Sequence, residues 1–402
     1  MPRVDGAALR AWRRSRGWDV PEMARRLRRA AQESGQPAAS QAGLVQMIYA
    51  WERGAHELTE RYQLLYAAAL GIDPDHVSHM PGEMPQPDER AAASLPPAVS
   101  AVTAGDVAVI RGMLDSLTAS DRQFGGAHAL AYAMDYLRTI VMPRLDAQSD
   151  DRVLQDLYAV TVEFQLRAAS MQMDAGRARE SRRLLGAAFP IAQATGAPIV
   201  SAWVLARCGE QLIQDGNIRQ ALAYTAGAAA MAARSTPGAR SFILVKNALA
   251  LSVTGDRRET ARALRDAWNA HDKAGSATEP QWMSVYGIEH LQHDEGRCYN
   301  NLGLGDQAVR AAEDSLQIRR LSRPRAFTLA VKALGYAQGA NKDLDLACDT
   351  GHELLAITSE IASNRVRLEL ARLLAALRPY QATPGVRDFL EAARPVMSVN
   401  AT

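Results

Sequence analysis

The sequence is poor in cysteine and contains no long apolar run. Only three of its 402 residues are cysteines, at positions 208, 298 and 348, and they are too far apart to form a Cys-x-x-Cys pair. This count excludes a disulfide scaffold and fits a reducing compartment. The most apolar run, residues 221–233, is too short to span a bilayer, and the amino terminus carries no secretory signal. We therefore expect a cytoplasmic protein with no membrane segment.

Motifs of the common enzyme classes are also missing. There is no P-loop, no Gly-x-Gly-x-x-Gly after a strand and no Gly-x-Ser-x-Gly. His290 and His293 share a helix face and could bind a divalent ion, but no third ligand follows at a recognised spacing. The sequence predicts no enzyme, no cofactor and no metal site. A metal-dependent hydrolase remains a remote alternative.

Charge is nearly balanced overall but uneven along the chain. Lys and Arg number 46 against 44 Asp and Glu, a formal net charge of +2. Between Arg3 and Arg29, however, nine arginines face only three acidic residues. A protein that is basic throughout is excluded, whereas a small basic module at the amino terminus is indicated.

The chain divides into three parts by composition. Residues 81–103 contain five prolines within positions 81–97, which cannot continue a helix and indicate a linker. Residues 1–80 precede it, and residues 104–402 follow as one helix after another with short breaks at Gly or Pro. The predicted fold class is all-α.

The breaks in residues 104–402 recur with a period near 40. Gly176, Gly216 and Gly255 are 40 and 39 residues apart, and a small residue (Ser181, Ala221, Ala261) follows each by five or six positions. Further units occur at residues 305–308 and 343–347, and a longer loop is expected near residues 275–280. Glycine permits the left-handed turn between paired helices, and small residues allow their close approach. The period predicts an α-solenoid.

The pattern of apolar and capping residues in positions 7–72 predicts a compact helical module. Asp19 caps a helix on which residues 20, 23, 24 and 27 form one apolar stripe, with Glu22 at the capping-box position. The next helix, from about Gln41 to Arg53, places residues 44, 47, 48 and 51 on its apolar face. We expect Trp51 in the core and Glu52 paired with an arginine of the first helix.

These motifs support two family resemblances. Gly209, Gly216-Asn217 and Ala221 are spaced as in a tetratricopeptide repeat. The amino-terminal module resembles the helix-turn-helix domain of xenobiotic-response-element-type (Cro/repressor-like) regulators. The matching positions are Leu9, Arg16-Gly17, residues 23–27, Ile48, Trp51-Glu52-Arg53-Gly54 and Ala69-Leu70-Gly71. Together with residues 121–128, the whole chain is similar to actinobacterial regulators that join these two parts, which implies a five-helix DNA-binding domain followed by tetratricopeptide-like repeats.

The resemblance implies a sequence-specific transcriptional regulator that binds double-stranded DNA as a homodimer and associates with the nucleoid. The third helix would present Gln46, Tyr49, Ala50 and Arg53 to the major groove. The candidate phosphate contacts are Arg13, Arg14, Arg25, Arg26, Arg28 and Arg29, of which we expect half to be solvated only. The alternative is a protein-interaction scaffold whose helix-turn-helix domain no longer binds DNA.

The repeats predict a concave surface for dimerisation and for a peptide or small-molecule effector. The candidate ligand-binding residues are polar positions within apolar helical runs: Arg207, Glu210, Gln211, Lys246, Asn247, Asn300 and Asn301. The competing interpretation is that they cap turns or face solvent. Trp203, Trp268 and Trp282 are expected in the repeat core. Arg319, Arg320, Arg323 and Arg325 form a basic cluster that could contact nucleic acid, but that we expect to cap and expose a helix end.

Overall fold

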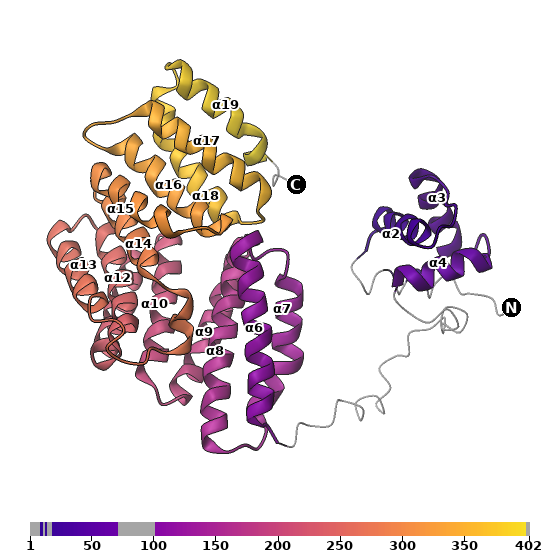
Figure 1. Cartoon of the computed structure of the whole chain (residues 1–402), viewed down its shortest axis with the longest axis horizontal. Helices are drawn as coiled ribbons and strands as arrows, with labels where there is room; N and C mark the ends of the chain where they lie inside the picture. The colour runs from indigo at the N-terminus through magenta and orange to yellow at the C-terminus, as the bar shows by residue number, and fades with distance from the viewer. Residues whose placement is uncertain (1–8, 11–12, 14–17, 71–100, 399–402) are drawn as a thin grey trace. The chain divides into compact units, whose positions relative to one another are not determined.

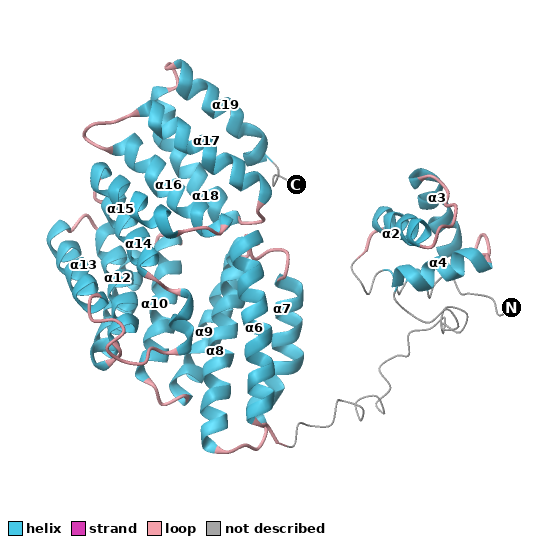
Figure 2. Ribbon diagram, in the orientation of Figure 1, coloured by secondary structure: helices cyan, strands magenta, loops and turns pink. Residues whose placement is uncertain are grey.

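A computed structural model describes residues 9–10, 13, 18–70 and 101–398 (Figure 1). Among these residues secondary structure is helical throughout, apart from one isolated β-bridge between Ala101 and Gln148, which confirms the all-α prediction (Figure 2). The chain separates into two compact units, Met1–Pro97 and Ala98–Thr402. None of the described helices has the length and apolar character needed to cross a membrane. Most of the expected proline-rich linker lies outside the described residues.

The amino-terminal unit contains α2 (Val20–Glu33), α3 (Gln41–Glu52) and α4 (Glu60–Leu70) around a small apolar core. The Asp19 side chain accepts a 2.6 Å hydrogen bond from the backbone N–H of Glu22, so the predicted cap of α2 is confirmed. The apolar stripe of α2 is buried as predicted, and Trp51 packs against the rings of Tyr62 and Tyr66. Of the five helices that the family resemblance implies, the first is described only at residues 9, 10 and 13, and residues 71–80 lie outside the description.

The carboxy-terminal unit, which we call the repeat unit, begins with α6 (Ala104–Phe124) and α7 (Leu130–Tyr136), which continues as a π-helical turn (Leu137–Val141) and a 3₁₀ turn (Met142–Asp146). Six helix pairs follow: α8 (Asp151–Asp174) with α9 (Ala178–Ala194), α10 (Pro198–Gln214) with α11 (Ile218–Met231), α12 (Pro237–Val253) with α13 (Arg257–His271), α14 (Ile288–Asn301) with α15 (Gly305–Ile318), α16 (Ser322–Gln338) with α17 (Leu344–Glu360), and α18 (Asn364–Leu377) with α19 (Pro384–Ser398). A 3₁₀ turn follows α11 (Ala232–Arg234) and another follows α18 (Arg378–Tyr380).

Glycines make the turns within the first four pairs. Gly176, Gly216 and Gly255 have φ between 76° and 79°, as the period predicted. In the fourth pair the left-handed residue is Gly303 at φ 71°, whereas Gly305 already begins α15, so the prediction was two residues late there. A side chain rarely adopts this conformation, which is why glycine recurs at the helix ends.

Small residues sit where the second helix of a pair packs on the first. Ser181, Ala221, Ala308 and Ala347 are fully buried, as expected. In the third pair the buried residue is Thr260, and the predicted Ala261 is exposed. The contact recurs as predicted, but the register there is off by one.

The first helices of successive pairs form an inner layer. Helices α8, α10, α12, α14, α16 and α18 contact one another in order. The layer also returns on itself, since α16 contacts α6 and α18 contacts α8 (Figure 1). The Ala362 N–H donates to the Phe124 carbonyl, and no side chain fits at Gly125 beside this contact because its Cβ would overlap the Ala362 carbonyl. The inner helices therefore enclose a central space.

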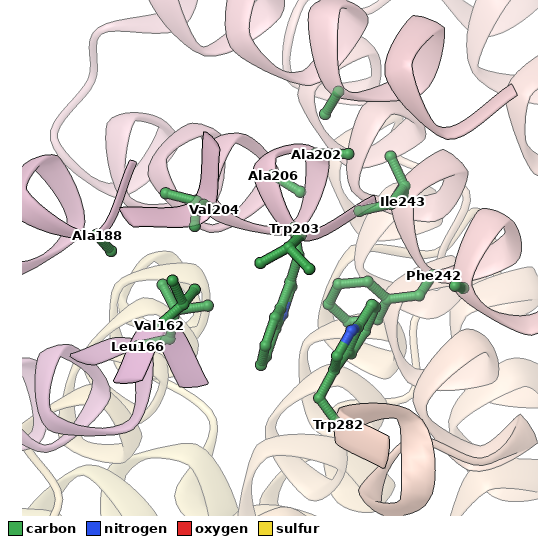
Figure 3. Close-up of a cluster of buried hydrophobic side chains, with 14 of the residues drawn as sticks. Val162, Leu166, Ala188, Ala202, Trp203, Val204, Ala206, Phe242, Ile243 and Trp282 are labelled. Carbon is green, nitrogen blue, oxygen red and sulfur yellow. The ribbon is translucent and has the colours of Figure 1, made fainter. Parts of the chain in front are cut away.

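A segment between the third and fourth pairs closes one side of that space. The expected longer loop runs from Asp272 to Gly287 and contains a 3₁₀ turn, η5 (Gln281–Val285). Trp282 of η5 stacks on Trp203 of α10, with ring centroids 4.3 Å apart, and Phe242 of α12 meets it edge-on (Figure 3). Trp203 and Trp282 are buried as predicted, while Trp268 is half-buried. The stack anchors η5 to the inner layer.

Candidate functional sites

The first candidate site is the outer face of α3 in the amino-terminal unit. Leu44, Ile48 and Trp51 point into the core, so the opposite face is exposed. Gln46 and Arg53 are exposed, Tyr49 is 47% exposed and Ala50 is half-buried. The Gln41 side chain donates to the Pro21 carbonyl, which ties the start of α3 to α2. The four predicted base-contacting residues thus share one solvent-facing surface.

Arg53 differs from the other three positions. It lies at the carboxy-terminal cap of α3, and its Nε donates a 3.1 Å hydrogen bond to the Tyr49 carbonyl. A recognition helix presents base contacts chiefly from its amino-terminal part. The position of Arg53 therefore suits a phosphate better than a guanine.

Arg13 departs from the predicted set of phosphate contacts. Its guanidinium is 9% exposed and forms two hydrogen bonds of 2.6 and 2.7 Å with the Glu52 carboxylate, and it also donates to the Trp18 carbonyl. The predicted pairing of Glu52 with an arginine of the first helix is confirmed. Arg13 is therefore a structural residue, because its guanidinium is ion-paired with Glu52 inside the unit.

The arginines of α2 remain on the surface. Arg25 and Arg26 both bind Glu22, with 60% and 43% of their side chains exposed. Arg28 and Arg29 are also exposed, and Arg14 lies outside the described residues. Exposed pairs exchange readily with solvent, so these side chains can reach an anionic surface.

The second candidate site is a cavity of about 490 Å³ inside the repeat unit, which we call the central cavity. Every helix of the inner layer contributes to its wall, and so do α6, η5 and the end of α15. Its volume falls within the range of roughly 300–1,000 Å³ that is usual for small-molecule sites. Most of the polar lining residues are charged.

One buried ion-pair network lies on the α10, α12 and α14 side of the cavity. Lys246 Nζ is 2.6 Å from Asp294 and 3.4 Å from Glu210, and Arg297 Nη1 is 3.0 Å from each carboxylate. Arg207 Nη1 is 2.5 Å from Glu210. Burial alone would raise the pKa of Glu210 and Asp294, but the surrounding cations outweigh it and lower both, that of Asp294 to about 2. Both carboxylates are ionised at neutral pH.

A second network joins the ends of the repeat unit. Arg323 of α16 is 2.9 Å from Asp121 of α6 and 2.8 Å from Asp174 of α8. Arg167 also binds Asp121, and Arg365 also binds Asp174, at 2.7 and 2.8 Å. These carboxylates are fully buried, so the cations of the wall fix them in place.

Two arginines of the wall lack such a partner. Arg122 donates to the Val285 carbonyl, and Arg319 donates to the Glu289 and Pro324 carbonyls and to the Ser315 hydroxyl. Within residues 101–398 neither forms an ion pair. Desolvation lowers the pKa of both, that of Arg319 to about 10, so each still carries its charge at neutral pH. The cavity therefore contains two cations without an ion-pair partner, and the Glu289 carboxylate acts on both of them.

His290 and His293 also line the central cavity, on α14. Desolvation lowers the pKa of His290 despite Glu289 Oε1 at 3.0 Å from its Nδ1, and it lowers that of His293 further. His293 Nδ1 is 3.2 Å from the Thr328 hydroxyl. Both are neutral hydrogen-bonding groups at neutral pH. No three His, Cys, Asp or Glu side chains in the described residues gather so as to hold a metal ion.

The predicted ligand-binding residues separate into two groups. Arg207, Glu210 and Lys246 do line the central cavity. The other four do not, and they connect neighbouring helices instead: Gln211 to Ser181 and Ala178, Asn247 to Thr225, Asn300 to Val331 and Asn301 to Ser252. These four link helices and none of them caps a turn. Of the four, Asn301 is exposed, as the competing interpretation of solvent-facing residues held.

Residues from the basic cluster 319–325 were not predicted as part of a site. Arg319 and Arg323 are each only 6% exposed and line the cavity, so the expectation of an exposed cluster was wrong for these two, whereas Arg320 is exposed as expected. Arg319 caps the end of α15 and Arg323 lies in the first turn of α16, so their spacing in the sequence gives no shared helix face. The cations Arg122 and Arg365 are single residues in unremarkable helices, so only the closed fold identifies them.

No family model matches this chain, and no curated protein matches it significantly.

Proposed function

We propose that the chain is a dimeric, sequence-specific DNA-binding transcriptional regulator whose repeat unit dimerises and senses an effector. The main observation in favour of this proposal is that α3 has one buried apolar face and one solvent-facing polar face. Its apolar side forms the core with α2 and α4, and its other side leaves Gln46 and Tyr49 exposed and Ala50 half-buried, while α2, which packs against α3, carries exposed arginines. A helix held in this way can enter the major groove while a neighbouring helix contacts the backbone.

Each exposed residue has a chemical role in this proposal. The Gln46 amide can bond N6 and N7 of adenine, and the Ala50 methyl can pack on a thymine methyl. Arg53, Arg25 and Arg28 supply phosphate contacts that add affinity without sequence information.

Binding to DNA tests the proposal directly. The full chain is titrated with its own upstream DNA and with unrelated duplexes across a salt series. We expect preferential binding to one sequence, with log K falling by about 0.9 per phosphate contact for each unit of log salt. Gln46→Ala should weaken binding to the preferred sequence by about 1–3 kcal/mol and leave unrelated duplexes unaffected. Equal binding to all duplexes would contradict the proposal.

The repeat unit supplies the sensing role. An effector that prefers one arrangement of the closed inner layer would shift the population of repeat-unit conformations, and in a dimer this changes the spacing of the two DNA-binding units. The central cavity supports this role because it is large enough for an effector and lies where the two ends of the layer meet.

A protein-interaction scaffold is the second candidate. Tyr49 exposes 47% of an aromatic side chain at the centre of the α3 surface, and Arg53 is the basic residue at its edge. Aromatic side chains are enriched in protein interfaces. Weak, salt-insensitive DNA binding that is indifferent to Gln46→Ala would favour this function.

A further inference from the structure

The central cavity has an excess of positive charge. Eight arginines and one lysine line it, against three carboxylates. Asp121 and Asp174 lie behind the wall and are already bound by Arg167, Arg323 and Arg365. When these two and Glu289, which acts on Arg122 and Arg319, are included, three positive charges remain without a carboxylate of their own. Such an excess in a partly desolvated space favours an anion.

The excess is concentrated at Arg122 and Arg319. Their hydrogen bonds go to backbone carbonyls and one hydroxyl, and neither forms an ion pair, although the ionised Glu289 carboxylate acts on both charges. Arg319 is 6% exposed, and the Nε of Arg122 is buried without any hydrogen-bond partner. Arg122, Arg319 and His290 all line the cavity, and both cations lower the pKa of His290. A buried guanidinium left in this state is costly unless an anion compensates it.

Helices α16 and α18 contribute apolar side chains to the cavity wall. Phe327 and Val331 of α16, with Leu368, Ala371 and Ala375 of α18, also line the cavity. Leu368 is 48% exposed, although it lies in the wall. An apolar surface beside uncompensated cations fits a ligand with an acidic group and an apolar part.

We propose that the central cavity binds a small organic anion, whose carboxylate or phosphate is held by Arg122 and Arg319 and whose apolar part packs on α16 and α18. This deepens the sensing role proposed above, and it rests on that role only for its effect on DNA binding.

The contact between Arg122 and Val285 connects this anion to η5. Arg122 Nη1 donates a 2.9 Å hydrogen bond to the Val285 carbonyl, three residues beyond the Trp282–Trp203 stack. An anion that engages Arg122 competes with this hydrogen bond and alters the environment of the stack. Tryptophan fluorescence therefore reports on the site independently of DNA.

The test uses the full chain and four probes: octanoate, octyl phosphate, 1-octanol and inorganic phosphate. We expect octanoate or octyl phosphate, at millimolar concentration, to raise the melting temperature and change the tryptophan fluorescence, and the preferred probe identifies the acidic group. Neither 1-octanol, which lacks the charge, nor inorganic phosphate, which lacks the apolar part, should match it. Equal binding of 1-octanol, or no response to either charged probe, overturns the proposal.

Two sets of variants locate the binding. Arg122→Gln should weaken binding of the charged probe roughly 10- to 100-fold, the loss expected for a hydrogen bond to a charged group. Arg257→Gln is the matched control, because Arg257 also donates to a backbone carbonyl, that of Leu302, but lies outside the cavity. Equal weakening by both variants would overturn the assignment.

Leu368→Glu and Leu368→Gln provide a second comparison that does not depend on Arg122. Leu368 is exposed, so both variants should fold, and they differ only in charge. Weaker binding of the charged probe by the Glu variant supports an anion in the cavity, and equal binding by the two contradicts it. If the probe binds while DNA binding fails, the cavity assignment stands and the regulatory proposal falls.

Discussion

Arg323 lies between Asp121 and Asp174, at 2.9 and 2.8 Å, although 202 residues separate it from Asp121. One guanidinium thereby joins α6 and α8, at the start of the repeat unit, to α16 of the fifth helix pair. All three side chains are buried, so loss of any one leaves the others uncompensated. The closed inner layer, and with it the central cavity, depends on this contact.

Arg323→Gln should therefore destabilise the repeat unit strongly. We expect the free energy of unfolding to fall by about 3–5 kcal/mol, the range for breaking a buried ion pair. Urea denaturation followed by far-ultraviolet circular dichroism measures it. Arg182→Gln, which breaks an exposed pair with Asp215, is the control and should cost about 0–1 kcal/mol. Equal losses of unfolding free energy in the two variants would show that the Arg323 ion pairs contribute little to the stability of the repeat unit.

Gly305 should not tolerate a side chain. A Cβ at this position would overlap the Gly335 carbonyl and the Gly339 backbone, where α15 and α16 approach closely. We expect Gly305→Ala to destabilise the unit by about 1–3 kcal/mol or more. Gly227→Ala is the matched control, since Gly227 lies within α11 with open space around its Cβ position, and should stabilise by about 0.5–1 kcal/mol. Thermal denaturation distinguishes the two, and a neutral Gly305→Ala would show that the helices can separate at no cost.

The sequence predicts the local features of this fold well. It does not predict that the inner layer of helices returns on itself through the contacts of α16 with α6 and of α18 with α8. The cap at Asp19 and the turns at Gly176 and Gly216 depend on nearby residues, so spacing alone reveals them. The contact between Arg323 and Asp121 depends on the accumulated curvature of the four helix pairs that lie between α6 and α16, which no local pattern encodes. For the same reason the sequence identified Arg207 and Lys246 as cavity residues but interpreted the region of Arg319 and Arg323 as an exposed helix end.

Glu52 should control the stability of the amino-terminal unit. Its carboxylate accepts two hydrogen bonds from the buried Arg13, so Glu52→Ala leaves that guanidinium unpaired. We expect a loss of about 3–5 kcal/mol in the unfolding of this unit and a parallel loss of DNA affinity at physiological temperature. Glu22→Gln, which removes only the exposed partner of Arg25 and Arg26, should leave the melting temperature nearly unchanged. Hydrogen exchange of α3 amides separates this unit from the repeat unit, and unchanged protection in Glu52→Ala would refute the role.

Acidification should destabilise the repeat unit in two separate steps. Burial lowers the pKa of His290 and His293 below about 6.5, so the unfolded chain binds protons that the folded chain does not once the pH falls below that value. Stability is complete above pH 6.5 and declines by up to about 1.4 kcal/mol per pH unit for each histidine. Asp294 and Glu289, whose pKa values are lowered to about 2, add a further loss only below about pH 4.5.

Melting temperatures between pH 7.5 and 5.5 measure the first of these steps. The charged groups that act on His293 are Arg319, Asp294, Arg297 and Lys246. The pKa of Arg319 is about 10, that of Asp294 is about 2 and that of Arg297 is raised, so these three keep their charge in this range. His293→Gln should reduce the slope, and His352→Gln removes a histidine outside the central cavity as the matched control. The same slope in His293→Gln and in the unmodified chain would exclude His293 as its source.

Arg28 tests whether α2 contacts the DNA backbone. It is exposed on α2 and makes no hydrogen bond or ion pair within the described residues, so its replacement should not disturb the fold. If α2 lies across the phosphates, Arg28→Ala should weaken binding equally for preferred and unrelated duplexes and reduce the slope of log K against log salt by about 1. Arg240→Ala, an exposed change in the repeat unit, should alter neither quantity. An unchanged slope with Arg28→Ala would place α2 away from the backbone, and DNA binding would then have to proceed without this helix.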